Sequence, residues 1–133
     1  MRSNDKGSVL VVDDDSDDRF TIVNAFKEIQ SERLCIPLEH GDQLMKYLAS
    51  ITPDNYPSVI LLDLNMPFKD GREVLRELKK DSRYKHIPTV VLTTSASAKD
   101  KSTVYKLGAN CFVSKPSKLR DFVNVIRSIS HMW

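Results

Sequence analysis

The sequence predicts an α/β protein built on a doubly wound, five-stranded parallel sheet with five helices. Short runs of continuous apolar residues, of which Val9–Val12 and Val59–Leu62 are the clearest, alternate along the chain with segments whose apolar residues recur at helical spacing. Strands that are apolar on both faces and alternate with helices indicate a parallel sheet covered on both sides. In such a sheet the functional site lies at the carboxyl ends of the strands, where the order of winding reverses.

The first two strand-helix units begin the chain. The first strand, Val9–Val12, ends in acidic residues, and the helix after it carries apolar residues on one broad arc: Phe20, Ile22, Val23, Phe26 and Ile29. The second strand, Leu34–Leu38, contains Pro37, which cannot donate a ladder hydrogen bond and therefore suits the edge of a sheet. Asp42 is expected to cap the second helix, whose apolar residues are Leu44, Met45 and Leu48.

Three further units follow in the same order. Val59–Leu62 is the third strand, and the helix beyond it has Val74, Leu75 and Leu78 on one face. Thr89–Leu92 is the fourth strand, and we expect the helix after it to pack most loosely because its apolar residues are few: Val104, Tyr105 and Leu107. Asn110–Ser114 is the fifth strand, and the last helix carries a continuous apolar stripe: Leu119, Phe122, Val123, Ile126 and Ile129.

Length and composition exclude several classes of protein. A chain of 133 residues suffices for one domain, which we place at residues 8–133 after an N-terminal tail at 1–7, with no output domain. The formal charge of +2 is too small to attract nucleic acid by bulk electrostatics. No apolar run approaches the about 20 residues that a membrane helix needs. We therefore expect a cytoplasmic protein that binds neither nucleic acid nor membrane, with Cys35 and Cys111 as buried free thiols.

Polar residues stand where four of the predicted strands end. Asp13 and Asp14 follow the first strand, Asp63 the third, Thr93 the fourth, and Lys115 the fifth. Neighbouring carboxylates repel one another unless a proton or a cation lies between them, and oxygen ligands suit a hard cation such as Mg²⁺. A metal beside a carboxylate, a hydroxyl and an ammonium favours phosphoryl transfer. Since the glycines are isolated and form no nucleotide loop, we expect the phosphoryl acceptor to be a side chain of this protein.

These residues together resemble the response-regulator receiver domain of the CheY-like superfamily. The resemblance rests on Asp13-Asp14 after an apolar run, on Leu62–Pro67 with Asp70-Gly71, on Thr93 and on Lys115-Pro116. It covers the chain from about Ser8 to Ile129 and implies a flavodoxin-like (βα)5 fold.

The resemblance also implies a role for each site residue. Asp63 accepts a phosphoryl group from a histidine kinase or a phosphotransfer protein, and Asp13, Asp14, Asp63 and the backbone carbonyl of Asn65 hold Mg²⁺. Thr93 hydrogen-bonds the phosphoryl group, Lys115 is its counter-ion, and Phe112 is the aromatic residue whose rotamer follows activation. Such a protein is a phosphoacceptor that assists its own phosphorylation and dephosphorylation, and its output surface is helix four, strand five and helix five. The Lys115–Pro116 peptide bond is expected to be cis, which turns the lysine over the acids.

A narrower resemblance concerns the partner. Gly71–Leu75, Leu92–Ser95, Ala109–Val113 and Trp133 are similar to the small regulators that partner phytochrome-type histidine kinases, although many of those have Glu at the position of Asp13. The output is then a contact with an unknown downstream protein, and the output surface can also form a homodimer.

Three alternative functions fit the sequence less well. A phosphatase of the haloacid-dehalogenase type needs a second aspartate where Asn65 stands, and a pseudo-receiver usually lacks one of the acids, the threonine or the lysine. A flavodoxin-like cofactor binder needs a phosphate-cradling loop after the first strand, where this chain has acids that repel phosphate. Asp15, Asp17 and Asp18 could be additional metal ligands, but the positive end of the helix dipole already accounts for acids in a first turn.

Overall fold

The computed structural model describes residues 7–29, 31–94 and 97–133 and confirms the predicted fold class. Five parallel strands form one sheet in the order β2-β1-β3-β4-β5. The strands are β1 (Val9–Val12), β2 (Cys35–Leu38), β3 (Val59–Leu62), β4 (Thr89–Thr93) and β5 (Cys111–Ser114). The helices are α1 (Ser16–Glu28), α2 (Gly41–Ala49), α3 (Gly71–Lys80), α4 (Ala98–Lys106) and α5 (Leu119–Met132), and a short 3₁₀ turn lies at Pro53–Asn55.

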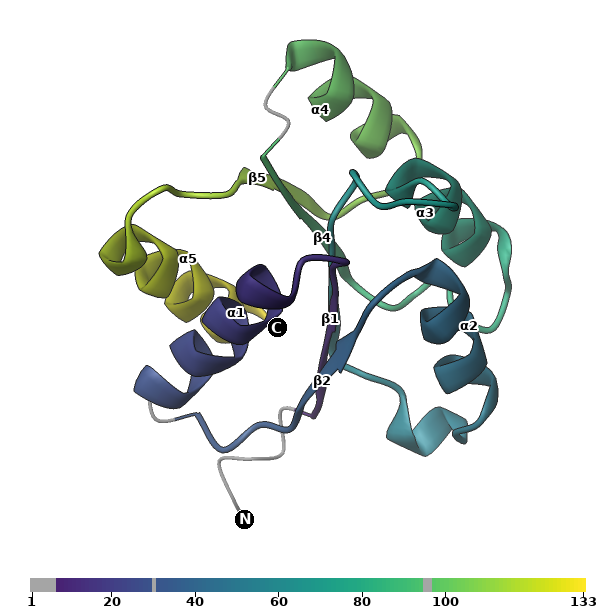
Figure 1. Ribbon diagram of the computed structural model, residues 1–133. Helices are drawn as coiled ribbons and strands as arrows, with labels where there is room; N and C mark the ends of the chain where they lie inside the picture. The colour runs from purple at the N-terminus through teal and green to yellow at the C-terminus, as the bar shows by residue number, and fades with distance from the viewer. Residues whose placement is uncertain (1–6, 30, 95–96) are drawn as a thin grey trace.

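The helices cover the sheet on both faces, with α1 and α5 side by side on one face and α2, α3 and α4 on the other (Figure 1). Successive strand residues point alternately to the two faces. Leu10, Val12 and Leu62 belong to the core under α2 and α3, whereas Val9 and Val11 belong to the core under α1 and α5. Each inner strand is therefore buried on both sides, which is the physical reason for its continuous apolar sequence.

Two predicted core residues are exposed instead. Phe20 and Leu119 are 70% and 64% exposed. Leu119 is the first residue of α5, whereas Phe20 is the fifth residue of α1 and lies about 160° around that helix from the buried Ile22. Phe20 therefore lies on the side of α1 opposite its buried residues, which are Ile22, Ala25 and Phe26. Leu119 is on the buried side of α5 by its spacing from Phe122 and Ile126, but it stands at the exposed start of that helix.

Three local predictions also need correction. The N-cap of α2 is His40, whose Nδ1 accepts the backbone N–H of Gln43 at 3.3 Å, and Asp42 lies inside the first turn. Leu34 precedes β2, and β5 begins after Asn110, whose side-chain oxygen accepts the N–H of Thr89 at 2.8 Å. Cys35 and Cys111 are half-buried free thiols, because both lie on edge strands with no neighbour on one side.

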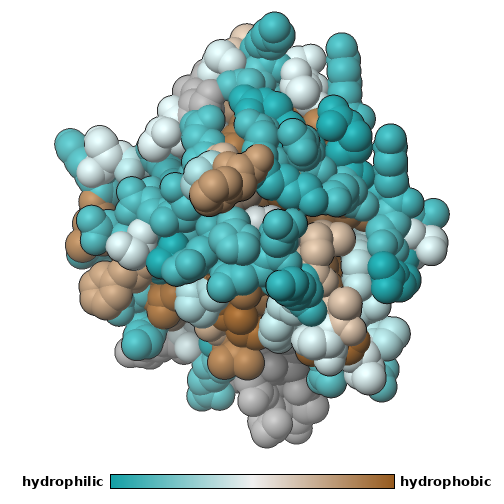
Figure 2. All heavy atoms as spheres, turned by 45° about the vertical axis from the view of Figure 1, so that its right-hand side comes forward, coloured by the Kyte–Doolittle hydropathy of each residue, from teal (hydrophilic) through white to brown (hydrophobic). Residues whose placement is uncertain are grey.

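Two predictions about packing are confirmed. Pro37 lies on the edge strand β2, as its missing donor requires. Helix α4 has one buried residue, Val104, fewer than any other α-helix of the described chain. Hydrophilic residues cover most of the surface in Figure 2, and no helix among the described residues is long and apolar enough to span a bilayer.

Candidate functional site

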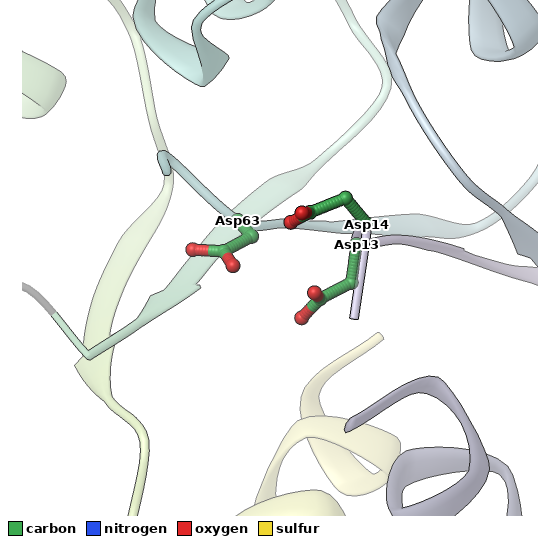
Figure 3. Close-up of side chains that lie close together, drawn as sticks. All are labelled: Asp13, Asp14 and Asp63. Atoms are coloured by element: carbon green, nitrogen blue, oxygen red, sulfur yellow. The ribbon is translucent and has the colours of Figure 1, made fainter. Parts of the chain in front are cut away.

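The predicted acidic site forms at the carboxyl edge of the sheet, where β1 and β3 end next to each other. Val12 pairs with Leu62, and the N–H of Asp63 donates to the carbonyl of Val12 at 3.0 Å. The residues that follow the two strands are therefore neighbours, and oxygens of Asp13, Asp14 and Asp63 lie within 4.8 Å of one another (Figure 3). Asp13 and Asp63 are buried and Asp14 is exposed.

The ammonium of Lys115 closes this site from the end of β5. Its backbone N–H continues the ladder by donating to the carbonyl of Thr93 at 2.8 Å. Its Nζ donates to Oδ2 of Asp13 at 2.6 Å and of Asp63 at 3.1 Å. Burial alone would lower the pKa of Lys115, but its hydrogen bonds to Asp13 and Asp18 raise that pKa above its usual value. The lysine is thus a fixed positive charge within the site.

Asp13 has an unusual ionisation equilibrium. Burial raises its pKa to about 6, and the hydrogen bonds from Lys115 and from the backbone N–H of Asp15 offset only part of that effect. The charge of Asp63 acts in the same direction as burial. Ionised Asp13 therefore carries a free-energy cost that a bound cation would relieve.

The predicted cis bond is wrong: the Lys115–Pro116 peptide is trans. The prediction assumed that a sharp turn of the chain is needed to aim the lysine at the acids. The extended end of β5 already brings Nζ to 2.6 Å from Asp13, so the long side chain makes the turn unnecessary.

Thr93 lies at the buried end of β4, next to the acidic cluster. The side-chain amide of Asn65 donates to its Oγ1 at 3.4 Å, and the N–H of Asn65 donates to Oδ1 of Asp63 at 3.3 Å. Asn65 therefore connects the acid of β3 with the hydroxyl of β4. Ser95, which the sequence resemblance also covered, lies outside the described residues.

The loop after Asp63 depends on one glycine. A Cβ at Gly71 would lie 2.2 Å from the carbonyl oxygen of Asp63 and 2.6 Å from Cα of Leu64. The N–H of Gly71 donates to the carbonyl of Leu64 at 2.9 Å. The first turn of α3 therefore packs directly on the backbone of the acid, which no larger residue permits.

Phe112 lies on the same face of the sheet as Thr93, two pairs further along the β4–β5 ladder. It pairs with Val91, and both contact the core under α2 and α3. Its backbone N–H donates to the hydroxyl of Tyr105 at 3.1 Å, so α4 is hydrogen-bonded to the outer edge of β5. The ring is half-buried, and two residues along a strand span about 7 Å.

Asp18 is a site residue, whereas the sequence analysis explained this acid by the helix dipole alone. Its Oδ2 accepts a hydrogen bond from Nζ of Lys115 at 2.7 Å. Asp15, in contrast, is the N-cap of α1 and accepts the N–H groups of Asp17 and Asp18. No local spacing signals this role, because Lys115 is 97 residues further along the chain.

Comparisons with known proteins agree with this geometry. The family model of the response regulator receiver domain matches residues 9–127. The chain belongs to this family. It is 36% identical to the response regulator Rcp1 of Synechocystis sp., over 98% of this chain and 91% of the relative. The chain also resembles the crystal structure of the Mn²⁺-bound form of Rcp1, with a TM-score of 0.84 and 35% sequence identity. That match covers 96% of this chain and 94% of the other. The phosphorylated cyanobacterial phytochrome response regulator RcpA is 34% identical with a TM-score of 0.87, covering 96% and 93%.

Family membership settles the general function. As a receiver domain the chain is a two-component response regulator, a signalling phosphoacceptor that interacts with a histidine kinase or a phosphotransfer protein. Receiver domains bind a divalent metal, and the carboxylate oxygens of Asp13, Asp14 and Asp63 are suitable ligands for a hard cation.

Proposed function

We propose that Asp63 is the phosphoacceptor, that the metal is Mg²⁺, and that phosphorylation switches the surface formed by α4, β5 and α5. The observation that carries the proposal is the convergence of the carboxylates of Asp13, Asp14 and Asp63 with the ammonium of Lys115 at one edge of the sheet. Asp63 is buried at the centre of that arrangement, with Lys115 on one oxygen and the N–H of Asn65 on the other.

Mg²⁺ would be held directly by Asp14, Asp63 and the backbone carbonyl of Asn65, and by Asp13 through water. When bound it would cancel the charge of the acids, so that an anionic phosphoryl group can approach. An oxygen of Asp63 then forms the new bond to phosphorus, and the bond from phosphorus to the donor's histidine nitrogen breaks with its electron pair going to that nitrogen.

Thr93 and Lys115 would bind the oxygens of the transferred group. Lys115 has the charge for this role and is already within the site, and Thr93 is placed by the amide of Asn65. Movement at the end of β4 would free space for Phe112, and the sparsely packed α4 would adjust at low cost. The output surface then binds a downstream protein or a second copy of the chain.

The proposal extends to Asn65, which we expect to influence the loss of the phosphoryl group by hydrolysis. It is exposed and bonded to both Asp63 and Thr93, so it borders the approach of a hydrolytic water. We include this self-catalysed dephosphorylation in the proposal.

The partner we propose is a phytochrome-type histidine kinase, on the basis of the likeness to RcpA. The unpaired thiols of Cys35 and Cys111 are usual in a reducing compartment and support a cytoplasmic location.

Intact mass spectrometry after incubation with acetyl phosphate and MgCl₂ tests the proposal. The parent protein should gain one phosphoryl group, and Asp63→Asn or an excess of EDTA should abolish the gain. Asp54→Asn, a change at an exposed acid of the 3₁₀ turn, is the matched control and should label like the parent. If Asp63→Asn labels as fast as the parent, another residue is the acceptor.

A further inference from the structure

The ammonium of Lys115 has three carboxylate partners, which belong to two different groups. Asp13 and Asp63 are members of the cluster that can hold a cation, whereas Asp18 is outside that cluster. An ammonium has three N–H donors, so these bonds use its full capacity. Only 5% of the Lys115 side chain is exposed, and water cannot replace a lost partner easily.

The position of Asp18 is set by the start of α1. The side chain of Asp15 accepts the N–H groups of Asp17 at 2.8 Å and Asp18 at 3.2 Å, which holds the first helical turn against the site. The carboxylate of Asp18 is 32% exposed, and so it is hydrated on one side while it pairs with a buried cation on the other. Keeping this half-hydrated carboxylate ionised therefore costs less free energy than ionising a fully buried one.

Metal binding would create a conflict at Lys115. A cation held by Asp13 and Asp63 uses the carboxylates that now neutralise the ammonium, and its own positive charge repels the ammonium. A buried charge without a partner is costly. Asp18 is the carboxylate partner of Lys115 that the cation leaves available.

We propose that Asp18 is a positioning residue for Lys115. It retains the ammonium at the rim of the site when a divalent cation binds to Asp13, Asp14 and Asp63, and it thereby strengthens cation binding. This inference rests on the proposed function, because it requires that these acids bind a divalent cation.

The test is a titration with MgCl₂ followed by amide chemical shifts in NMR. Asp18→Asn should weaken Mg²⁺ binding about tenfold. Mutation of a residue that supports a metal ligand typically lowers metal affinity by about 10- to 100-fold. Asp17→Asn removes the same charge from an exposed residue of the same turn, outside the ion pairs of Lys115, and should change affinity less than about twofold.

A double-mutant cycle separates positioning from the charge of Asp18 itself. In a Lys115→Met background, Asp18→Asn should change the Mg²⁺ affinity less than about twofold, because there is no ammonium left to position. A second measurement follows the ammonium protons of Lys115 by NMR with saturating Mg²⁺. They should exchange with water faster in Asp18→Asn than in Asp17→Asn.

The outcomes separate this inference from the proposed function. Equal weakening by Asp17→Asn and Asp18→Asn, or an undiminished effect in the Lys115→Met background, would show that only charge matters and would overturn the positioning role. The positioning role would also be overturned if Asp18→Asn binds Mg²⁺ as tightly as the parent does, while acetyl phosphate labels the parent normally. A parent that neither binds Mg²⁺ nor is labelled would contradict the proposed function as well.

Discussion

Replacing Asp13 with Asn should stabilise the metal-free protein at alkaline pH. Burial raises the pKa of Asp13 from 3.8 to about 6 in the folded state. Each pKa unit corresponds to about 1.4 kcal/mol, so the ionised carboxylate lowers the free energy of unfolding by about 3 kcal/mol. Asn resembles the protonated acid and can still accept the N–H of Asp15, so the variant avoids that cost.

The pH dependence gives the prediction its sign. Below about pH 4 Asp13 is protonated in both the folded and the unfolded chain, and the substitution should have little effect. Between about pH 4 and 6 the folded chain binds more protons than the unfolded chain, so the parent loses stability as the pH rises. Above about pH 6 both states are ionised, and the advantage of Asp13→Asn should level off at about 2 to 3 kcal/mol.

Urea unfolding followed by circular dichroism between pH 4 and 8 in EDTA measures the effect. Asp17→Asn, a change at an exposed acid of α1, is the control and should follow the parent to within about 0.5 kcal/mol at each pH. A stability difference between Asp13→Asn and the parent that does not vary with pH would refute the reasoning from burial. So would a variant that is less stable than the parent at pH 8.

Three further substitutions test other parts of the structure. Gly71→Ala should lower the free energy of unfolding by about 3 kcal/mol, measured by urea unfolding, because the new Cβ meets the carbonyl of Asp63. A variant as stable as the parent would contradict that close approach. Tyr105→Phe removes the acceptor of the Phe112 N–H and should cost about 1 kcal/mol, with faster hydrogen exchange at that amide; unchanged exchange would show that the bond is unimportant. Asn65→Lys should change the decay rate of the phosphorylated protein, measured by intact mass over time, and an unaltered rate would place the attacking water elsewhere.

Much of the fold and of the acidic cluster could be predicted because both depend on local sequence. Continuous apolar runs such as Val59–Leu62 require burial on two faces, and parallel strands place their carboxyl ends at one edge. The meeting of Asp13 and Asp63 then follows from strand order, which brings β1 beside β3.

The remaining features depend on three-dimensional contacts that no spacing rule contains. The helix dipole was a sufficient explanation for Asp18, and only the position of Lys115 at the end of β5 shows its second role. His40 caps α2 because its Nδ1 lies within hydrogen-bond distance of the N–H of Gln43. Asp is in general the commoner N-cap residue.

The outer strands of the sheet have a consequence for the behaviour of the protein at high concentration. An exposed strand edge is a template on which another chain can pair and aggregate. Here β2 and β5 are each four residues long, Pro37 removes a donor from one, and the hydroxyl of Tyr105 occupies the N–H of Phe112 on the other. Both edges therefore resist strand-to-strand assembly, and copies of this chain that associate should do so through side chains on helical surfaces, leaving each sheet separate.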